Sequence, residues 1–266
     1  MKNRYDIEQK TRIVYHPRYL TGYTTAACES PARLRSILAA LGEVYPLVEP
    51  SPCSEEDLLR CHSEGLLLLE KTDPERYEVA RLAAGGAVLC LELALEGYLC
   101  FGALRPPGHH AHPDRNGGFC IFNNMAVAVK KALAEGRIVS AVILDIDLHF
   151  GDGTEAQFEG DGRVRVINIG SALPGDFLRE TEKELKDAPA SDILAISAGF
   201  DQYEKDWGAN LSTGDFFTVG FLAGEYAAAK TGGRVFALLE GGYYVPDLGK
   251  NVLALLEGVC SAGTSP

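Results

Sequence analysis

Short, continuously apolar runs alternate along this sequence with longer segments of helical periodicity, and this alternation most constrains the fold. A run that is apolar throughout suits a strand covered on both faces, as in a parallel sheet between helices. The sequence therefore predicts an α/β fold with a mainly parallel sheet. Six runs have the length and composition of strands: Arg12–Tyr15, Leu99–Leu104, Ser140–Ile146, Arg163–Ile169, Asp192–Ser197 and Arg234–Leu239.

Helix start signals lie between these runs. Ser30-Pro31 precedes a helix over Ala32–Leu41, and Ser54 begins a segment that we expect to be helical through His62. No linker rich in Pro, Ser or Gly interrupts the middle of the chain, so we expect residues 1–266 to form a single domain. Four further helices are expected, at Arg76–Glu96, Asn124–Glu135, Asp215–Lys230 and Asp247–Leu256.

Charge and cysteine content narrow the class of protein. Lys and Arg number 25 against 37 Asp and Glu, and the net charge of −12 disfavours direct binding to nucleic acid. The seven cysteines form no C-x-x-C pair and lie mostly in apolar runs, which favours a reduced, cytoplasmic protein. The charged start of the chain lacks a signal-peptide core, and the run Leu66–Leu69 is too short to span a membrane. These features do not indicate an oligomeric state.

Polar, glycine-rich segments follow four of the expected strands. Ligands bind outside the carboxyl ends of strands in open parallel sheets, so these segments can converge on one site. The four segments are RPPGHHAHPDRNGG, DIDLHFGDG, AGFDQYEKD and EGGYY.

The segment Asp145-Ile-Asp147-Leu-His149 alternates polar and aliphatic residues, which places its two carboxylates and its imidazole on one side of an extended chain. Neighbouring acids at a buried strand end are costly unless they are paired or bind a cation. With Asp201 as a third ligand, the oxygen and nitrogen donors suit a catalytic zinc site with an open position. Taken alone, Asp145 and Asp147 are equally compatible with a helix cap and a hydrogen-bonded core acid.

His109 and His110 are neighbours in a Pro- and Gly-rich segment. Beside a carboxylate cluster they can form two imidazole–carboxylate pairs, and Asp145 and Asp152 are the candidate partners. Tyr243 follows another strand end. If its hydroxyl reaches the same site, it can donate to a developing oxyanion.

These blocks together resemble the histone deacetylase family in its broad sense, which includes acetylpolyamine amidohydrolases and acetoin-utilisation proteins. The resemblance rests on RPPGHHAHPDRNGGFCIFNN, DIDLHFGDG, SAGFD and LEGGYY, which occur in family order, and ESPARL and EDLLRCHSEGLL extend it toward the amino terminus. It implies the arginase/deacetylase fold, with an open, mainly parallel eight-stranded sheet between helices. It also implies hydrolysis of an N-acetyl amide by a zinc-dependent deacetylase.

The resemblance also implies a role for each site residue. Asp147, His149 and Asp201 would bind Zn²⁺, or Fe²⁺ in the cell. His110 would be the general base, oriented by Asp152, and His109 its electrostatic partner, oriented by Asp145. The remaining implied features are Tyr243 as a donor to the acetyl oxygen, Gly118 and Phe119 as the walls of a narrow tunnel, and a structural K⁺ held by backbone oxygens near Asp145, Asp147 and His149.

Three other functions compete with acetyl-lysine hydrolysis. A two-metal ureohydrolase of the arginase kind would need further carboxylates, but Gly151 and Tyr203 stand two positions after His149 and Asp201. A non-catalytic acyl-binding regulator would have no need of a general base. The acetylpolyamine amidohydrolases of the family that this chain resembles carry an inserted loop in their amino-terminal part. In this chain only a short segment, EKTDPE, precedes the helix expected at Arg76. We therefore expect an open entrance and acetyl-lysine, rather than a small acetylated amine, as the preferred substrate.

Overall fold

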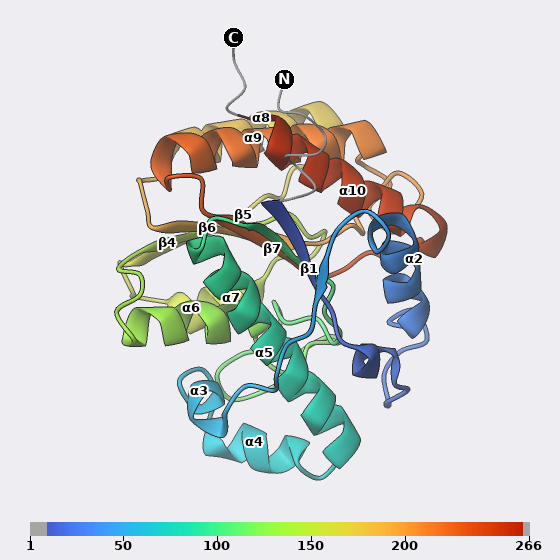
Figure 1. Ribbon diagram of the computed structural model, residues 1–266, viewed down its shortest axis with the longest axis vertical. Helices are drawn as coiled ribbons and strands as arrows, with labels where there is room; N and C mark the ends of the chain where they lie inside the picture. Colours follow the sequence, from blue (N-terminus) through green and yellow to red (C-terminus); the bar gives the residue numbers. More distant parts are fainter. Residues whose placement is uncertain (1–9, 263–266) are drawn as a thin grey trace.

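A computed structural model describes residues 10–262 and confirms the α/β fold, with a sheet between two layers of helices (Figure 1). All six expected strands are present within two residues of their expected bounds, and every strand pair in this sheet is parallel. The strands are β1 (Thr11–Val14), β3 (Leu99–Gly102), β4 (Ala141–Asp145), β5 (Val164–Asn168), β6 (Ile193–Ala198) and β7 (Val235–Leu239).

Within residues 10–262 the sheet has seven strands, so the expected number of eight is wrong for this part of the chain. The seventh strand is β2 (Leu47–Val48), an edge strand that pairs with β1. Its two residues are half-buried or exposed and lie between Pro46 and Pro50, so no apolar run marks it. At the opposite edge, Pro174 begins a helix soon after β5 ends at Asn168, and the intervening segment forms no strand.

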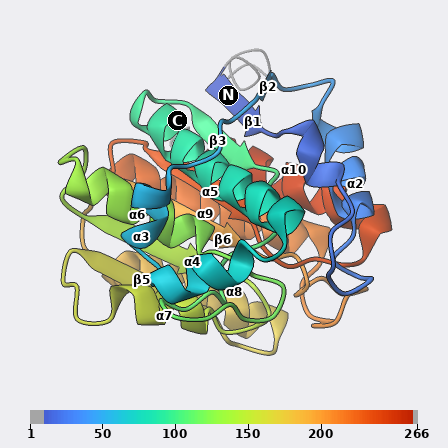
Figure 2. The same cartoon turned by 90° about the horizontal axis from the view of Figure 1, so that it is seen from below.

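Helices cover both faces of the sheet. One face carries α8 (Pro174–Asp187), α9 (Thr213–Lys230) and α10 (Val245–Ser261), and α2 (Pro31–Leu41) packs against α10 (Figure 1). On the other face, α5 (Pro74–Leu95) crosses the sheet beside α6 (Asn124–Ala134), as seen from below in Figure 2. No helix among residues 10–262 is long and apolar enough to cross a membrane.

The helix expected from Ser54 through His62 is shorter than predicted. It is α3 (Glu55–Leu59), and the hydroxyl of Ser63 then accepts from the Leu66 N–H to start α4 (Glu64–Glu70). The expected helix therefore stops at its C-cap, Arg60, and α4 lies beyond the expected segment as a separate helix that was not predicted. Three further elements were not expected, namely the 3₁₀ helix η1 (Pro17–Leu20), α7 (Asp152–Phe158) and α8.

The strand order is β2-β1-β3-β7-β6-β4-β5, which makes β3, β7, β6 and β4 consecutive neighbours. These are the four strands that precede the polar segments identified in the sequence. Because all four run in the same direction, their carboxyl ends meet at one edge of the sheet. The order of the strands therefore brings the four segments together.

Candidate active site

Asp147, His149 and Asp201 form a compact group of possible metal ligands at this edge. One ligand atom from each lies within 4.8 Å of the others. His149 Nδ1 lies 3.2 Å from Asp147 Oδ1 and 3.0 Å from Asp201 Oδ2, and both carboxylates are buried. The imidazole is therefore placed between two carboxylates contributed by the ends of β4 and β6.

Backbone N–H groups hold these two carboxylates in place. Asp147 Oδ1 accepts from the N–H of His149 at 2.9 Å and Asp201 Oδ1 from the N–H of Leu148 at 3.0 Å. Burial raises the pKa of Asp201 to about 6, and the neighbouring charge of Asp147 adds to this effect. A cation bound between these two buried carboxylates would offset the repulsion between their negative charges.

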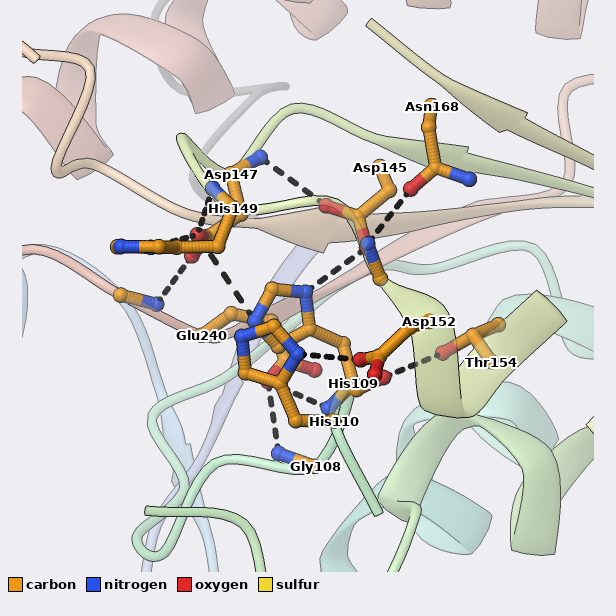
Figure 3. A network of polar contacts seen from close by, with 12 residues as sticks. Gly108, His109, His110, Asp145, Asp147, His149, Asp152, Thr154, Asn168 and Glu240 are labelled. Atoms are coloured by element: carbon orange, nitrogen blue, oxygen red, sulfur yellow. Dashed lines mark hydrogen bonds and ion pairs between the residues drawn. The ribbon is translucent and has the colours of Figure 1, made fainter. Parts of the chain in front are cut away.

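The rings of the two adjacent histidines lie 4.1 Å apart between centroids with their planes tilted by 42°, and each ring contacts its own carboxylate (Figure 3). His109 Nδ1 lies 3.0 Å from Asp145 Oδ2, and His110 Nδ1 lies 2.6 Å from Asp152 Oδ1. These are the two pairs that the family resemblance implied. In each pair the Nδ1–H donates to a carboxylate, which leaves Nε2 as the ring nitrogen available to a substrate.

The surroundings of the two rings shift their pKa values in opposite directions. Burial by itself lowers the pKa of His109, but the carboxylates of Asp147 and Asp145 outweigh burial and raise it well above its ordinary value. Burial and the charge of His109 lower the pKa of His110. These shifts favour the charged form of His109 and the neutral form of His110, which can accept a proton.

A narrow cavity of about 70 Å³ lies between the histidines, His149 and Tyr243. Gly118 and Phe119 line it, and the Phe119 ring meets the Tyr243 ring edge-on at 5.8 Å between centroids. A Cβ on Gly118 would lie 3.1 Å from the His110 ring, and this residue has φ +54°, so glycine suits both its conformation and the available space. The structure thus brings together all the site residues named from the sequence.

Sequence reasoning missed three residues at this site. Buried Glu240 accepts from the N–H groups of Gly108 and His109 at 2.7 and 3.1 Å and so anchors the histidine segment. Trp207, whose side chain is half exposed, stacks on Tyr243 at 4.2 Å between centroids.

The third missed residue is His112, whose Nε2 lies 2.9 Å from Asp152 Oδ2. A sequence signal existed for each of the three residues. Glu240 and His112 lie inside the quoted blocks, and Trp207, the single tryptophan of the chain, follows Asp201 closely.

Comparison with a solved structure supports the assignment of the fold. A crystal structure of the HDA15 HD domain superposes with a TM-score of 0.85 and 23% sequence identity, covering 96% of this chain and 91% of that one. The seven-stranded parallel sheet and its helical layers are therefore those of a deacetylase-type α/β domain.

Sequence comparisons identify the family. Residues 27–177 match the family model described as histone deacetylase domain. A probable deacetylase of Methanothermobacter thermautotrophicus is 31% identical over 300 residues, covering 93% of this chain and 90% of the relative. A histone deacetylase-like amidohydrolase of Pseudomonas aeruginosa is 31% identical over 297 residues, covering 90% and 78%. The chain belongs to the histone deacetylase family and is thereby a hydrolase of the deacetylase and amidohydrolase class.

Proposed function

We propose that this protein is a zinc-dependent deacetylase that hydrolyses an N-acetyl amide, with acetyl-lysine in proteins or peptides as its preferred substrate. The observation that carries the proposal is the placement of a three-residue ligand set and a histidine pair around one narrow cavity. An amide bond held in this cavity would lie beside the proposed metal site, whose ion would act as a Lewis acid. A histidine of the pair would be within reach to accept a proton.

The residues present fit a divalent metal ion. Two buried carboxylates and one imidazole are oxygen and nitrogen donors of the kind that zinc takes in catalytic sites. Three protein ligands would leave the fourth position of a tetrahedral zinc ion to water or substrate. Asp147, His149 and Asp201 would hold the ion, either Zn²⁺ or Fe²⁺. A bound ion would polarise the acetyl carbonyl and promote deprotonation of water. The structural K⁺ near Asp145 remains a prediction from the family resemblance.

The two histidines have different roles in the reaction. His110 is neutral, with Nδ1–H directed at Asp152, so its Nε2 takes the proton of the attacking water. His109, held by Asp145, keeps its positive charge beside the reacting carbonyl. When the C–N bond breaks, a protonated histidine of the pair gives its proton to the leaving amine.

Tyr243 also lines the cavity. Its ring lines the cavity with Phe119 and stacks on Trp207. These contacts support a placement in which the phenol would lie beside the acetyl group of a bound substrate. The Tyr243 hydroxyl would donate to the oxyanion that forms during attack. Gly118 and Phe119 would contact the aliphatic part of the acyl-bearing side chain.

The preference for acetyl-lysine rests on the outer part of the site. Only a short connection separates α4, which ends at Glu70, from α5, which begins at Pro74, so no inserted loop narrows the entrance from there. An open rim does not exclude the bulky backbone of a peptide, and a slender polyamine loses the steric advantage that a constricted channel would give it.

The decisive experiment compares kcat/KM for acetyl-lysine peptides with kcat/KM for acetylputrescine and acetylspermidine. We expect the peptides to be hydrolysed at least as well as the polyamines. A preference of more than about tenfold for the polyamines, or roughly 1.4 kcal/mol in transition-state binding, would assign the protein as an acetylpolyamine amidohydrolase. If the metal-loaded protein binds acyl substrates without turnover, the non-catalytic alternative holds instead.

A further inference from the structure

The carboxylate of Asp152 contacts two histidines, one through each oxygen. Oδ1 lies 2.6 Å from Nδ1 of His110, and Oδ2 lies 2.9 Å from Nε2 of His112. The Asp152 side chain is 53% exposed, in contrast to the buried Asp145 beside His109. A half-exposed carboxylate needs a second partner to keep one orientation, because water competes for its oxygens.

The hydrogen bonds around His112 define which ring nitrogen carries the proton. A guanidinium nitrogen of Arg115 lies 3.2 Å from His112 Nδ1, and a guanidinium can only donate. Nδ1 is therefore the acceptor, and the neutral ring carries its hydrogen on Nε2. That N–H points at Asp152 Oδ2, so His112 is a hydrogen-bond donor to the carboxylate.

The backbone of His112 is also held on both sides. Its N–H donates to the carbonyl of Arg115 at 2.9 Å, which closes a turn. Its carbonyl accepts from Nδ1 of His62 at 2.9 Å, and the next carbonyl, of Pro113, accepts from the N–H of Ser63 at 2.7 Å. His62 Nε2 accepts from the N–H of Asn123, which leaves the His62 hydrogen on Nδ1 for this bond. The ring of His112 is thus held in place before substrate binds.

We propose that His112 is a positioning residue for hydrolysis, which acts on His110 through Asp152. This inference rests on the proposed function, in which His110 is the general base. With its N–H on Oδ2, His112 keeps Oδ1 aligned with the Nδ1–H of His110 while that ring gains and loses a proton. Without it, the carboxylate turns toward water and His110 loses its fixed orientation.

Kinetics of two substitutions separate positioning from packing. In His112→Ala the donor is lost, and we expect kcat to fall by about tenfold with KM changed less than about twofold, since outer partners of a site contribute 10- to 100-fold. Glutamine carries an N–H at a similar reach, so His112→Gln should restore most of kcat. His16→Ala is the matched control, because the His16 ring accepts from the Arg18 N–H and packs on Tyr19 outside the site. Equal activity of His112→Ala and wild type would overturn the proposal, as would equal losses in His112→Ala and His112→Gln.

A third substitution tests the tautomer without altering the histidine. Arg115 is exposed, so Arg115→Ala should leave the fold intact while freeing His112 Nδ1 to take the hydrogen. We expect a decrease in kcat smaller than that of His112→Ala. A larger decrease than that of His112→Ala would contradict a role that Arg115 exerts through His112.

Nitrogen-15 NMR of the histidine rings tests the same contact without any substrate. In wild type, His112 should show the Nε2–H tautomer, and His110 a hydrogen-bonded Nδ1–H. In His112→Ala the Nδ1–H signal of His110 should shift and exchange faster with water, with the signals of His16 unchanged. An unaltered His110 signal would overturn the positioning role. Absence of turnover in the wild type, with the His110 signal altered in the variant, would overturn the proposed function alone.

Discussion

The backbone N–H of Gly241 donates to Asp147 Oδ2 at 2.7 Å, which joins the segment after β7 to the segment after β4. A Cβ at position 241 would lie 2.5 Å from that oxygen and 2.7 Å from Asp201 Oδ2, closer than real contacts allow. Glycine at this position therefore lets the backbone approach both acids at once. The hydrogen bond fixes the carboxylate of Asp147, which we propose as a metal ligand together with Asp201, and the first prediction concerns their metal.

Asp201→Ala should lose bound metal and turnover together, because it removes one of three proposed ligands and leaves Asp147 and His149 too few to retain the ion. Elemental analysis should find about one divalent ion per wild-type chain. Asp187→Ala, which alters an exposed acid paired with Lys183, is the control and should keep both metal and activity. Two equivalent ions per wild-type chain would contradict the single-metal site.

His110→Ala should abolish most of the turnover while leaving the metal in place, since general-base catalysis contributes about 10²- to 10⁴-fold and this ring is not a proposed ligand. Steady-state kinetics and metal analysis of the same preparation give both readouts. Loss of the metal in this variant would show that the role assigned to His110 is wrong.

Tyr243→Phe should lower kcat by about 10²- to 10³-fold, or roughly 3–4 kcal/mol, because it removes one donor to the oxyanion while keeping the ring packing. The neighbouring Tyr244→Phe is a matched control, because its ring packs on Tyr203 and does not line the cavity. If kcat is unchanged in Tyr243→Phe, the phenol does not serve the oxyanion.

Acid should destabilise the fold through His62. Burial lowers the pKa of this ring to about 4 from an ordinary value of 6.5, so below pH 6.5 the unfolded chain binds a proton that the folded chain does not. The contribution is intact above pH 6.5 and is lost progressively as the pH falls toward 4. At about 1.4 kcal/mol per pKa unit, we expect a loss of about 2 kcal/mol between pH 7 and pH 5.

Denaturant titrations at the two pH values measure this loss as a change in the free energy of unfolding. In His62→Gln the same change should be smaller by most of that amount, since an amide can donate to His112 and accept from Asn123 without titrating. An identical pH dependence in the variant and the wild type would show that His62 is not responsible.

The sequence by itself determined the strands and the residues at their ends. Runs such as Ser140–Ile146 and Asp192–Ser197 are apolar throughout, and burial on both faces follows directly from that local pattern. The alternation from Asp145 to His149 places three polar side chains together because neighbouring side chains of an extended segment point in opposite directions. Strand β2 was not predicted, because its two residues between prolines are too few to show the apolar run or the alternation that marks a strand.

Only the tertiary structure decided which partners the side chains of the site meet. Sequence spacing could not show that Glu240 anchors the histidine segment, that Trp207 stacks on Tyr243, or that Asp152 contacts His112 as well as His110. Each of these contacts joins segments that follow different strands, and their meeting depends on the order β3-β7-β6-β4 in the sheet. Local periodicity reports burial and secondary structure, whereas that order is set by how the whole chain packs its helices across the sheet.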